Sequence, residues 1–119
     1  VQISDLPVVI ADAKGRILLH NRAFAALLPQ TRQTYEFVDD LAVFFDAASD
    51  ARRRLKDLVE LRRTWRGEVT LLRSGLEPHS FLVRGDPVFS SPDRILGFVL
   101  LFTDIADRKA AEAAGRRFQ

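Results

Sequence analysis

Few residues of this chain could do chemistry, and their spacing assembles no reactive group. The sequence contains no cysteine, which excludes disulfides, thiolate chemistry, zinc fingers and c-type haem attachment within it. Its two histidines, His20 and His79, stand far apart, without the convergent ligands that a metal site needs. Asp39 and Asp40 are adjacent, but neighbouring side chains on a helix point about 100° apart. Four serines of predicted turns have no histidine and carboxylate partners for nucleophilic catalysis: Ser74, Ser80, Ser90 and Ser91.

No catalytic constellation follows from these residues, so we predict that the chain itself is not an enzyme. Its glycines are dispersed and form no phosphate-binding loop. We therefore expect a binding or signalling role, in which the apolar interior and the ends of the elements matter more than reactive side chains.

The composition is that of one soluble globular domain, with 119 residues, 47% hydrophobic and 29% charged. A net charge of only +2 does not favour nucleic-acid binding. No apolar run approaches the roughly 20 residues of a membrane span, and no signal peptide is visible. The chain begins without methionine and stops within a helical pattern, as would a segment of a longer, cytoplasmic protein.

The first elements predicted are a β-hairpin and a short helix. Residues 7–12 and 17–20 are apolar runs of strand type, and Gly15 lies in the turn between them. Asn21 is a good N-cap for a helix over residues 22–28, which Pro29 ends.

Two helical segments are expected in the middle of the chain. Phe37, Leu41, Phe44 and Phe45 follow the spacing of one α-helical face. Ser49 or Asp50 could cap a second helix, whose apolar side consists of Ala51, Leu55, Leu58 and Val59. Its other side is rich in arginine. We interpret it as a solvated surface in preference to a phosphate or nucleic-acid site.

Three strands follow, over residues 67–72, 80–89 and 95–103, separated by short turns. Short turns make neighbouring strands antiparallel. The order of two strands, helices and three strands predicts an α+β fold with the helices gathered on one face of the sheet.

The last strand meets a helical run over residues 105–114 without a flexible loop. Asp104 stands between them, and its carboxylate can accept the free N–H groups of the first helical turn. Movement of the sheet would therefore reach the helix directly, as expected of an output joint. Ala111, Ala114 and Phe118 recur at helical spacing and form a short stripe by which two such helices could pair.

These segments together resemble the PAS domain family over roughly residues 6–112. The first hairpin and helix carry LPVVIAD at 6–12, GRI at 15–17 and NRAF at 21–24, and WRGEV at 65–69 is similar to the usual start of the third strand. Asp104-Ile105, with Asp107-Arg108-Lys109 and Glu112, resembles the C-terminal PAS boundary. The turn at residues 73–75, Arg-Ser-Gly, lacks the acidic residue that the family usually has there.

The resemblance implies a five-stranded antiparallel sheet closed by helices on one face, followed by a C-terminal linker helix. It divides the chain into a sensor domain, residues 1–104, and the start of a signalling helix, residues 105–119. Asp104, Ile105 and Arg108 are then the expected signal-transfer residues. Its partners would be its own C-terminal effector domain and, in the full-length protein, a second copy. A sensor histidine kinase is the favoured effector. A diguanylate cyclase sensor and a ligand-free protein–protein interaction domain are the alternatives.

Cofactors of the family can be tested against the residues. A flavin photosensor that forms an adduct needs a cysteine, which is absent. A haem sensor commonly uses a histidine on the long middle helix, and residues 49–65 contain none. We interpret His20 and His79 as structural or surface residues, and predict no metal and no cofactor. A non-covalent flavin or a small apolar ligand stays open.

A pocket, if there is one, would be lined by the inward faces of the strands and helices. Strand alternation places inward Val9, Ala11, Thr70, Leu72, Phe81, Val83, Gly85, Phe98, Leu100 and Phe102, facing Phe37, Leu41, Phe44, Leu55 and Leu58. The simplest interpretation is that these side chains fill an apolar core. The more specific alternative is that they surround a small cavity for an apolar or aromatic ligand. The candidate pocket residues are Thr70, Leu72, Phe81, Val83, Phe98, Leu100, Phe102, Phe44 and Leu58.

Overall fold

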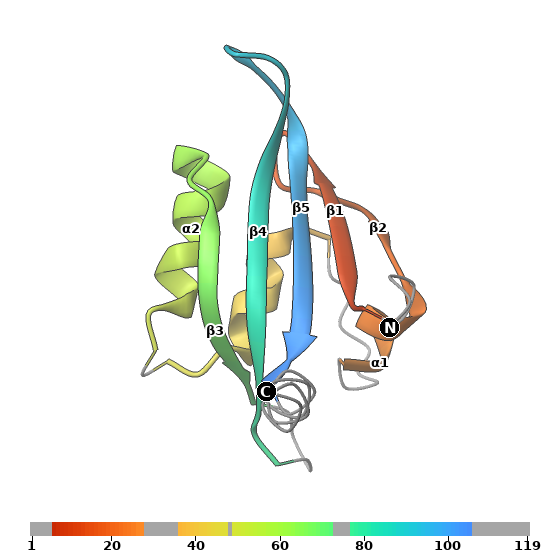
Figure 1. The fold of residues 1–119 in the computed structure, drawn as a ribbon, viewed down its shortest axis with the longest axis vertical. Helices are drawn as coiled ribbons and strands as arrows, with labels where there is room; N and C mark the ends of the chain where they lie inside the picture. The colour runs from red at the N-terminus through yellow and green to blue at the C-terminus, as the bar shows by residue number, and fades with distance from the viewer. Residues whose placement is uncertain (1–5, 28–35, 48, 73–76, 106–119) are drawn as a thin grey trace, which may run out of the picture.

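The computed structural model describes residues 6–27, 36–47, 49–72 and 77–105. In these ranges the chain forms a five-stranded antiparallel sheet in the order β2-β1-β5-β4-β3, with helices on one face (Figure 1). This arrangement confirms the predicted α+β fold. The elements in chain order are β1 (Val8–Asp12), β2 (Ile17–His20), α1 (Arg22–Leu27), η2 (Val38–Phe44), α2 (Ala51–Leu61), β3 (Trp65–Leu71), β4 (His79–Ser91) and β5 (Arg94–Asp104).

The first hairpin forms for the local reasons that the sequence indicated. Asp12 Oδ1 accepts hydrogen bonds from the backbone N–H groups of Lys14 and Arg16, both at 2.9 Å. Gly15 takes a φ of 85°, which an L side chain would resist. Asn21 caps α1, because its Oδ1 accepts from the backbone N–H of Phe24 at 3.0 Å. The same oxygen accepts from Val8 N at 3.0 Å, which ties the helix start to β1.

The first middle helix differs from the expectation. Residues 38–44 form a 3₁₀ helix, and its buried side chains are Val38, Leu41 and Phe44. With three residues per turn, positions three apart share a face, whereas the predicted spacing assumed 3.6. Phe37 is accordingly 39% exposed and does not face the core, so that prediction was wrong for it. Phe45 is buried immediately after the helix.

Helix α2 follows the predicted pattern. Ala51, Leu55 and Leu58 are buried. Ser49 Oγ accepts from the backbone N–H of Ala51 at 3.3 Å, and Arg62 ends the helix in a left-handed conformation with φ 56°. The arginine-rich side of the helix is exposed, as its interpretation as a solvated surface requires.

Strand β3 is out of phase with the prediction by one residue. Its buried side chains are Trp65, Val69 and Leu71, because Val69 pairs with Phe81 and Leu71 with His79. Thr70 faces the other side of the sheet, and its Oγ1 lies 2.9 Å from Ser80 Oγ. A shift of one residue exchanges the two faces of a strand.

Leu72 lies past the end of β3. It is 43% exposed, and its backbone N–H donates to Phe44 O at 2.7 Å. The placement of Thr70 and Leu72 on the inner face was therefore wrong.

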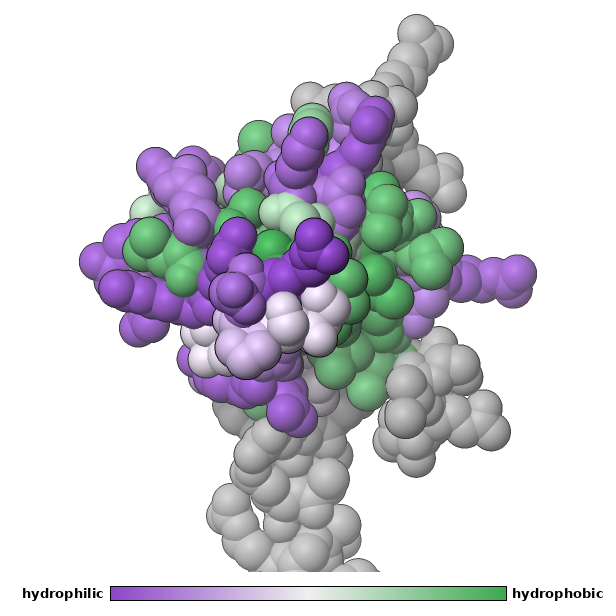
Figure 2. Space-filling view, turned by 90° about the horizontal axis from the view of Figure 1, so that it is seen from above, coloured by the Kyte–Doolittle hydropathy of each residue, from purple (hydrophilic) through white to green (hydrophobic). Residues whose placement is uncertain are grey.

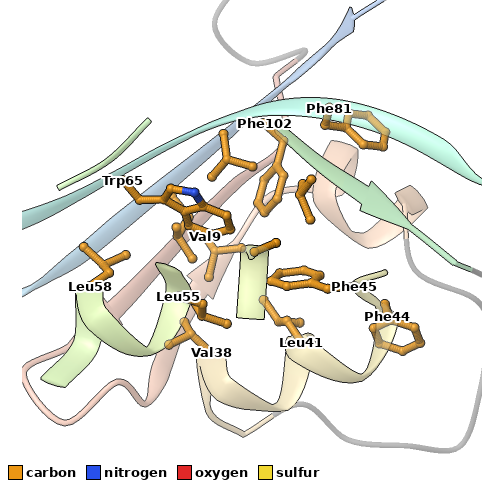
Figure 3. Close-up of a cluster of buried hydrophobic side chains, with 14 of the residues drawn as sticks. Val9, Val38, Leu41, Phe44, Phe45, Leu55, Leu58, Trp65, Phe81 and Phe102 are labelled. Atoms are coloured by element: carbon orange, nitrogen blue, oxygen red, sulfur yellow. The ribbon is translucent and has the colours of Figure 1, made fainter. Parts of the chain in front are cut away.

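The core lies between the inner face of the sheet and the helices η2 and α2 (Figure 3). Phe44, Leu58 and Phe98 are buried, which confirms their expected place in it. Packing is tight where β4 passes α2: a Cβ added to Gly85 would lie 2.8 Å from Leu58 Cδ2 and 2.9 Å from Leu100 Cδ2. The absence of a side chain at Gly85 therefore lets the helix approach the sheet closely.

Candidate functional site

The interior is filled by apolar side chains. A void of about 10 Å³ lies where β3 and β5 end, which is the lower end of the domain in Figure 1. It is lined by Phe24, Leu41, Phe44, Phe45, Leu71 and Phe102. A volume of this size is at or below the room that one water needs. Ligand pockets usually measure roughly 300–1,000 Å³ and carry a few convergent polar groups. Within the described ranges, no polar or charged side chain is buried.

The candidate pocket residues divide into two groups. Seven of them are buried on the inner face, and only two of these, Phe44 and Phe102, line the small void. Thr70 and Leu72 do not face the interior. The buried seven are Phe81, Val83, Phe98, Leu100, Phe102, Phe44 and Leu58. Their role in binding stays a prediction, and Phe45 and Leu71 belong beside them as wall residues that the sequence pattern did not single out as pocket residues.

The side chains of the described interior do not fit a flavin. An isoalloxazine ring presents carbonyl oxygens and ring nitrogens, which lose hydrogen bonds to water on burial and need protein partners instead. The wall of the void is made of phenylalanine and leucine, and its volume is far below that of the ring. This void therefore offers neither the space nor the polar partners for the cofactor.

A polar contact lies where the chain leaves the sheet. Asp104 is the last residue of β5, and its Oδ2 lies 2.6 Å from Nε2 of His79, the first residue of β4. Both side chains are partly exposed, at 41% for His79 and 30% for Asp104. Ile105 adopts helical backbone conformation immediately afterwards, which agrees with a direct strand-to-helix joint. Arg108, like the alanine and phenylalanine stripe expected beyond it, lies outside the described residues.

A row of aromatic rings leads from this contact into the core. The ring of His79 lies 4.8 Å from that of Phe81, and Phe81 meets Phe102 edge-on at 6.4 Å. Phe102 lies 5.8 Å from Phe24, whose ring is 5.8 Å from His20. Phe102 also lines the void. The joint is thus connected through packed rings to the small void at the lower end of the interior.

Sequence reasoning did not find the contact between His79 and Asp104. The two residues are 25 positions apart and are brought together only by the pairing of β4 with β5. Asp104 had been singled out as a helix cap and His79 as a structural or surface residue. No sequence spacing connects them.

The two adjacent carboxylates at residues 39–40 have separate positions. Asp40 Oδ2 accepts from the backbone N–H groups of Glu36 at 3.1 Å and Phe37 at 2.9 Å, at the start of η2. Asp40 therefore has a structural role. In the described ranges, no group of three or more His, Cys, Asp or Glu side chains is close enough together to hold a metal ion.

The outer face of the sheet carries a shallow apolar groove. It has a volume of about 280 Å³ and is lined by Ile10, Ala11, Leu18, Val88, Leu96, Gly97, Phe98 and Val99. Viewed along the long axis, hydrophobic residues gather on the side of β1 and β2, and hydrophilic residues on the side of α2 (Figure 2). Among the helices that the structure describes, none is long and apolar enough to cross a membrane.

Comparison with protein families decides the identity of the fold. The sequence model of the PAS domain matches residues 5–107, which is most of the chain. The chain belongs to the PAS domain family. This agrees with the resemblance seen in the hairpin, the start of β3 and the C-terminal boundary. Comparison with curated proteins finds no match.

Solved PAS and LOV structures share the fold of this PAS domain. The PAS domain of the fruit-fly ELK potassium channel has a TM-score of 0.71 at 14% identity, covering 87% of this chain and 89% of that one. The LOV protein of Rhodobacter sphaeroides has a TM-score of 0.67 at 20% identity, covering 93% and 67%. The LOV domain of the blue-light activated histidine kinase EL346 from Erythrobacter litoralis has a TM-score of 0.63 at 18% identity, covering 83% and 94%.

These identities are low, so the likeness extends to the fold alone. One fold carries many functions, and what a PAS domain senses or drives depends on its own residues. In this PAS domain the residues to consider are those of the apolar interior and of the polar joint at the end of β5.

Proposed function

We propose that this PAS domain is a regulatory sensory or dimerisation module that passes a signal through its C-terminal helix to an effector. The observation that carries the proposal is the joint itself: β5 runs through the core and ends at Asp104, and Ile105 is already helical. Because no loop separates the two elements, a change in the tilt of β5 would be transmitted to the helix instead of being absorbed. The proposed signal-transfer residues are Asp104, Ile105 and Arg108.

Packing at the end of β5 supports this route. Phe102 is buried, lines the small void and contacts both Phe24 and Phe81. It stands two residues before Asp104, on the same face of the strand. A change in the packing around Phe102 would therefore act on the last residues of β5, immediately before the joint.

The proposed effector is a sensor histidine kinase, and a diguanylate cyclase is the alternative. One of the similar structures is the LOV domain of a histidine kinase, which supports the first choice only by analogy of fold. The sequence that follows Gln119 in the full-length protein would distinguish these two effectors. A helix with a phosphorylatable histidine, followed by an ATP-binding domain, would support the histidine kinase. A cyclase domain would support the diguanylate cyclase instead.

Transmission is tested by fusing the chain through Gln119 to the dimerisation and catalytic domains of a histidine kinase. We expect Asp104→Ala to change the autophosphorylation rate severalfold. Asp93→Ala is the matched control, because Asp93 is an exposed aspartate in the distant β4–β5 turn and should leave the rate unchanged. Equal rates for the wild type and Asp104→Ala would contradict the proposal.

A ligand-free interaction domain is the second candidate, favoured by the filled interior. The interior void of about 10 Å³ is too small for a small-molecule signal. It would then respond to a partner protein or to its own dimerisation. We expect purified protein to show no visible chromophore. A Soret band or flavin bands in stoichiometric amount would contradict this expectation.

The proposed partners are the chain's own effector and, in the full-length protein, a second copy. The exposed apolar side chains Leu18, Leu19 and Leu96 on the outer face support self-association. Light scattering of the full-length protein tests this, with Leu96→Asp expected to weaken the dimer.

A cytoplasmic location also remains part of the proposal, and cell fractionation tests it.

A further inference from the structure

We propose that the hydrogen bond between His79 and Asp104 is a proton-dependent latch, which holds the start of β4 to the end of β5 more strongly when His79 is protonated. It is a property of the folded domain and goes beyond the proposed output, since it is present whatever effector follows. The geometry points to it first: Nε2 of His79 and Oδ2 of Asp104 are 2.6 Å apart.

At this separation a hydrogen must lie between the two atoms, because two bare acceptors would repel each other. A neutral imidazole meets this need only in the tautomer that carries its hydrogen on Nε2. A protonated imidazole meets it in either case and adds a full charge to the contact. An ionised carboxylate already strengthens the bond to a neutral ring, and the charge of a protonated ring adds Coulomb attraction to it. Proton uptake by His79 therefore strengthens the contact while the carboxylate of Asp104 stays ionised.

The surroundings of His79 leave Asp104 as its close charged partner in the part of the chain that the structure describes. From β3 the residue paired with His79 is Leu71, which carries no charge. On its own strand the ring lies 4.8 Å from that of Phe81, tilted by 46°. The segment that leads into β4 contributes Glu77, which is exposed.

The position of the pair gives the proton a structural effect. The two β-strands are in register up to the pairing of Phe81 with Asp104, and His79 extends β4 two residues beyond it. The latch therefore joins β4 to β5 beyond the last described backbone pair between these two strands. It lies immediately before Ile105, which is helical. The latch is expected to be tighter in mildly acidic solution, where histidine side chains are generally charged, than in mildly alkaline solution.

A double-mutant cycle on the 119-residue chain tests the latch. Unfolding of the wild type, His79→Gln, Asp104→Asn and the double variant is measured at about pH 5.5 and about pH 8.5. We expect the coupling between the two positions to favour folding by roughly two- to fivefold in the equilibrium constant at the lower pH, as measured for partly exposed ion pairs. It should be clearly smaller at the higher pH. Coupling that is absent, or equal at the two pH values, would overturn the proposal.

A second measurement keeps the test decisive if a variant folds poorly. In NMR spectra of the wild type, the amide signal of Ile105 should move with pH in step with the ring signals of His79. His20→Gln serves as the matched control, because His20 lies on β2 with its ring against Phe24. It should leave the movement of Ile105 unchanged, whereas His79→Gln should abolish it. An Ile105 signal that does not follow the His79 ring, or that titrates equally in His79→Gln, would overturn the latch.

Discussion

The centre of the inner face and its lower end are built from different contacts. At the centre, Leu58, Gly85 and Leu100 approach so closely that even a methyl group would be crowded. At the lower end, Phe44 and Phe102 line a small void, and a half-exposed pair, His79 and Asp104, closes the sheet. Dispersion contacts on all sides oppose displacement at the centre. Part of the lower end is instead open to water, because His79 and Asp104 are half-exposed.

This difference suggests how a small domain can be both stable and responsive. Well-packed regions resist local change, whereas elements that move in signalling are drawn from the less stable parts of a structure. In the proposed function of this PAS domain, the responsive part is next to the chain's exit from the sheet. Substitutions in the two regions should therefore differ in both size and kind.

The largest effect is expected from Phe98→Ala at the centre. Phe98 is fully buried on β5, and removing its ring leaves a cavity that the tight surroundings cannot fill. The free energy of unfolding should fall by about 3–5 kcal/mol. Chemical denaturation measures this loss. Phe44→Ala, beside the existing void, should cost less, and equal losses would show that the two regions are packed alike.

A smaller but still clear loss is expected from Gly97→Ala. A Cβ at Gly97 would overlap the carbonyl oxygen of Ala11, a backbone atom of the neighbouring strand that cannot rotate away. Crowding of this kind costs about 1–3 kcal/mol or more. Gly85→Ala is the matched comparison, since its new methyl would be crowded by the tips of Leu58 and Leu100, which are side chains and not backbone. Thermal unfolding should place Gly97→Ala below Gly85→Ala, and the reverse order would contradict this account of the packing.

At the lower end, Asp104→Ala should cost only about 1 kcal/mol, the usual loss for a single cap or hydrogen bond. The contact with His79 is partly exposed, so water replaces much of what is lost. The melting temperature measures the loss. A decrease as large as that of Phe98→Ala would mean that the joint belongs to the rigid core.

The smallest effect expected is a gain in stability from Asp39→Asn. Partial burial, then the charges of Glu60 and Asp40, raise the pKa of Asp39, and Lys56 only partly offsets them. A carboxyl group whose pKa is raised on folding destabilises the folded protein once it is ionised. Removing its charge should therefore raise the melting temperature at neutral pH, and the gain should vanish below about pH 4.

Asp40→Asn is the natural control for this prediction. Asp40 accepts two backbone hydrogen bonds at the start of η2, so its loss of charge should weaken the fold instead of strengthening it. If both variants raised the melting temperature equally at neutral pH, the local environment of Asp39 would not be the cause.

Local patterns were sufficient for much of this fold. The first hairpin, the Asn21 cap and the buried side of α2 depend on residues close together in the chain, and they formed as expected. The family resemblance added the five-stranded sheet. The direct passage from β5 to Ile105 could also be predicted, because an apolar run followed by Asp104 leaves no residues for a loop.

Two features of the fold depended on tertiary contacts. The buried positions of η2 follow a spacing of three, because its tight turn is set by how it packs against the sheet and α2. The phase of β3 follows from its pairing with β4, which turned Thr70 outward and Leu71 inward. A period-two pattern in a strand that is apolar at several consecutive positions fits either phase, and only the partner strand selects one.

The candidate site shows the same division. Asp104 was recognisable from its place between a strand and a helix, whereas His79 could be identified only from the folded chain. The pairing of β4 with β5 brings the two within 2.6 Å although 25 positions separate them. Such a pair leaves no trace in local sequence, because neither residue needs the other for its own element to form. The interior volume is likewise a tertiary property: the same apolar residues could enclose a ligand or fill the space, and their packing in this PAS domain leaves about 10 Å³.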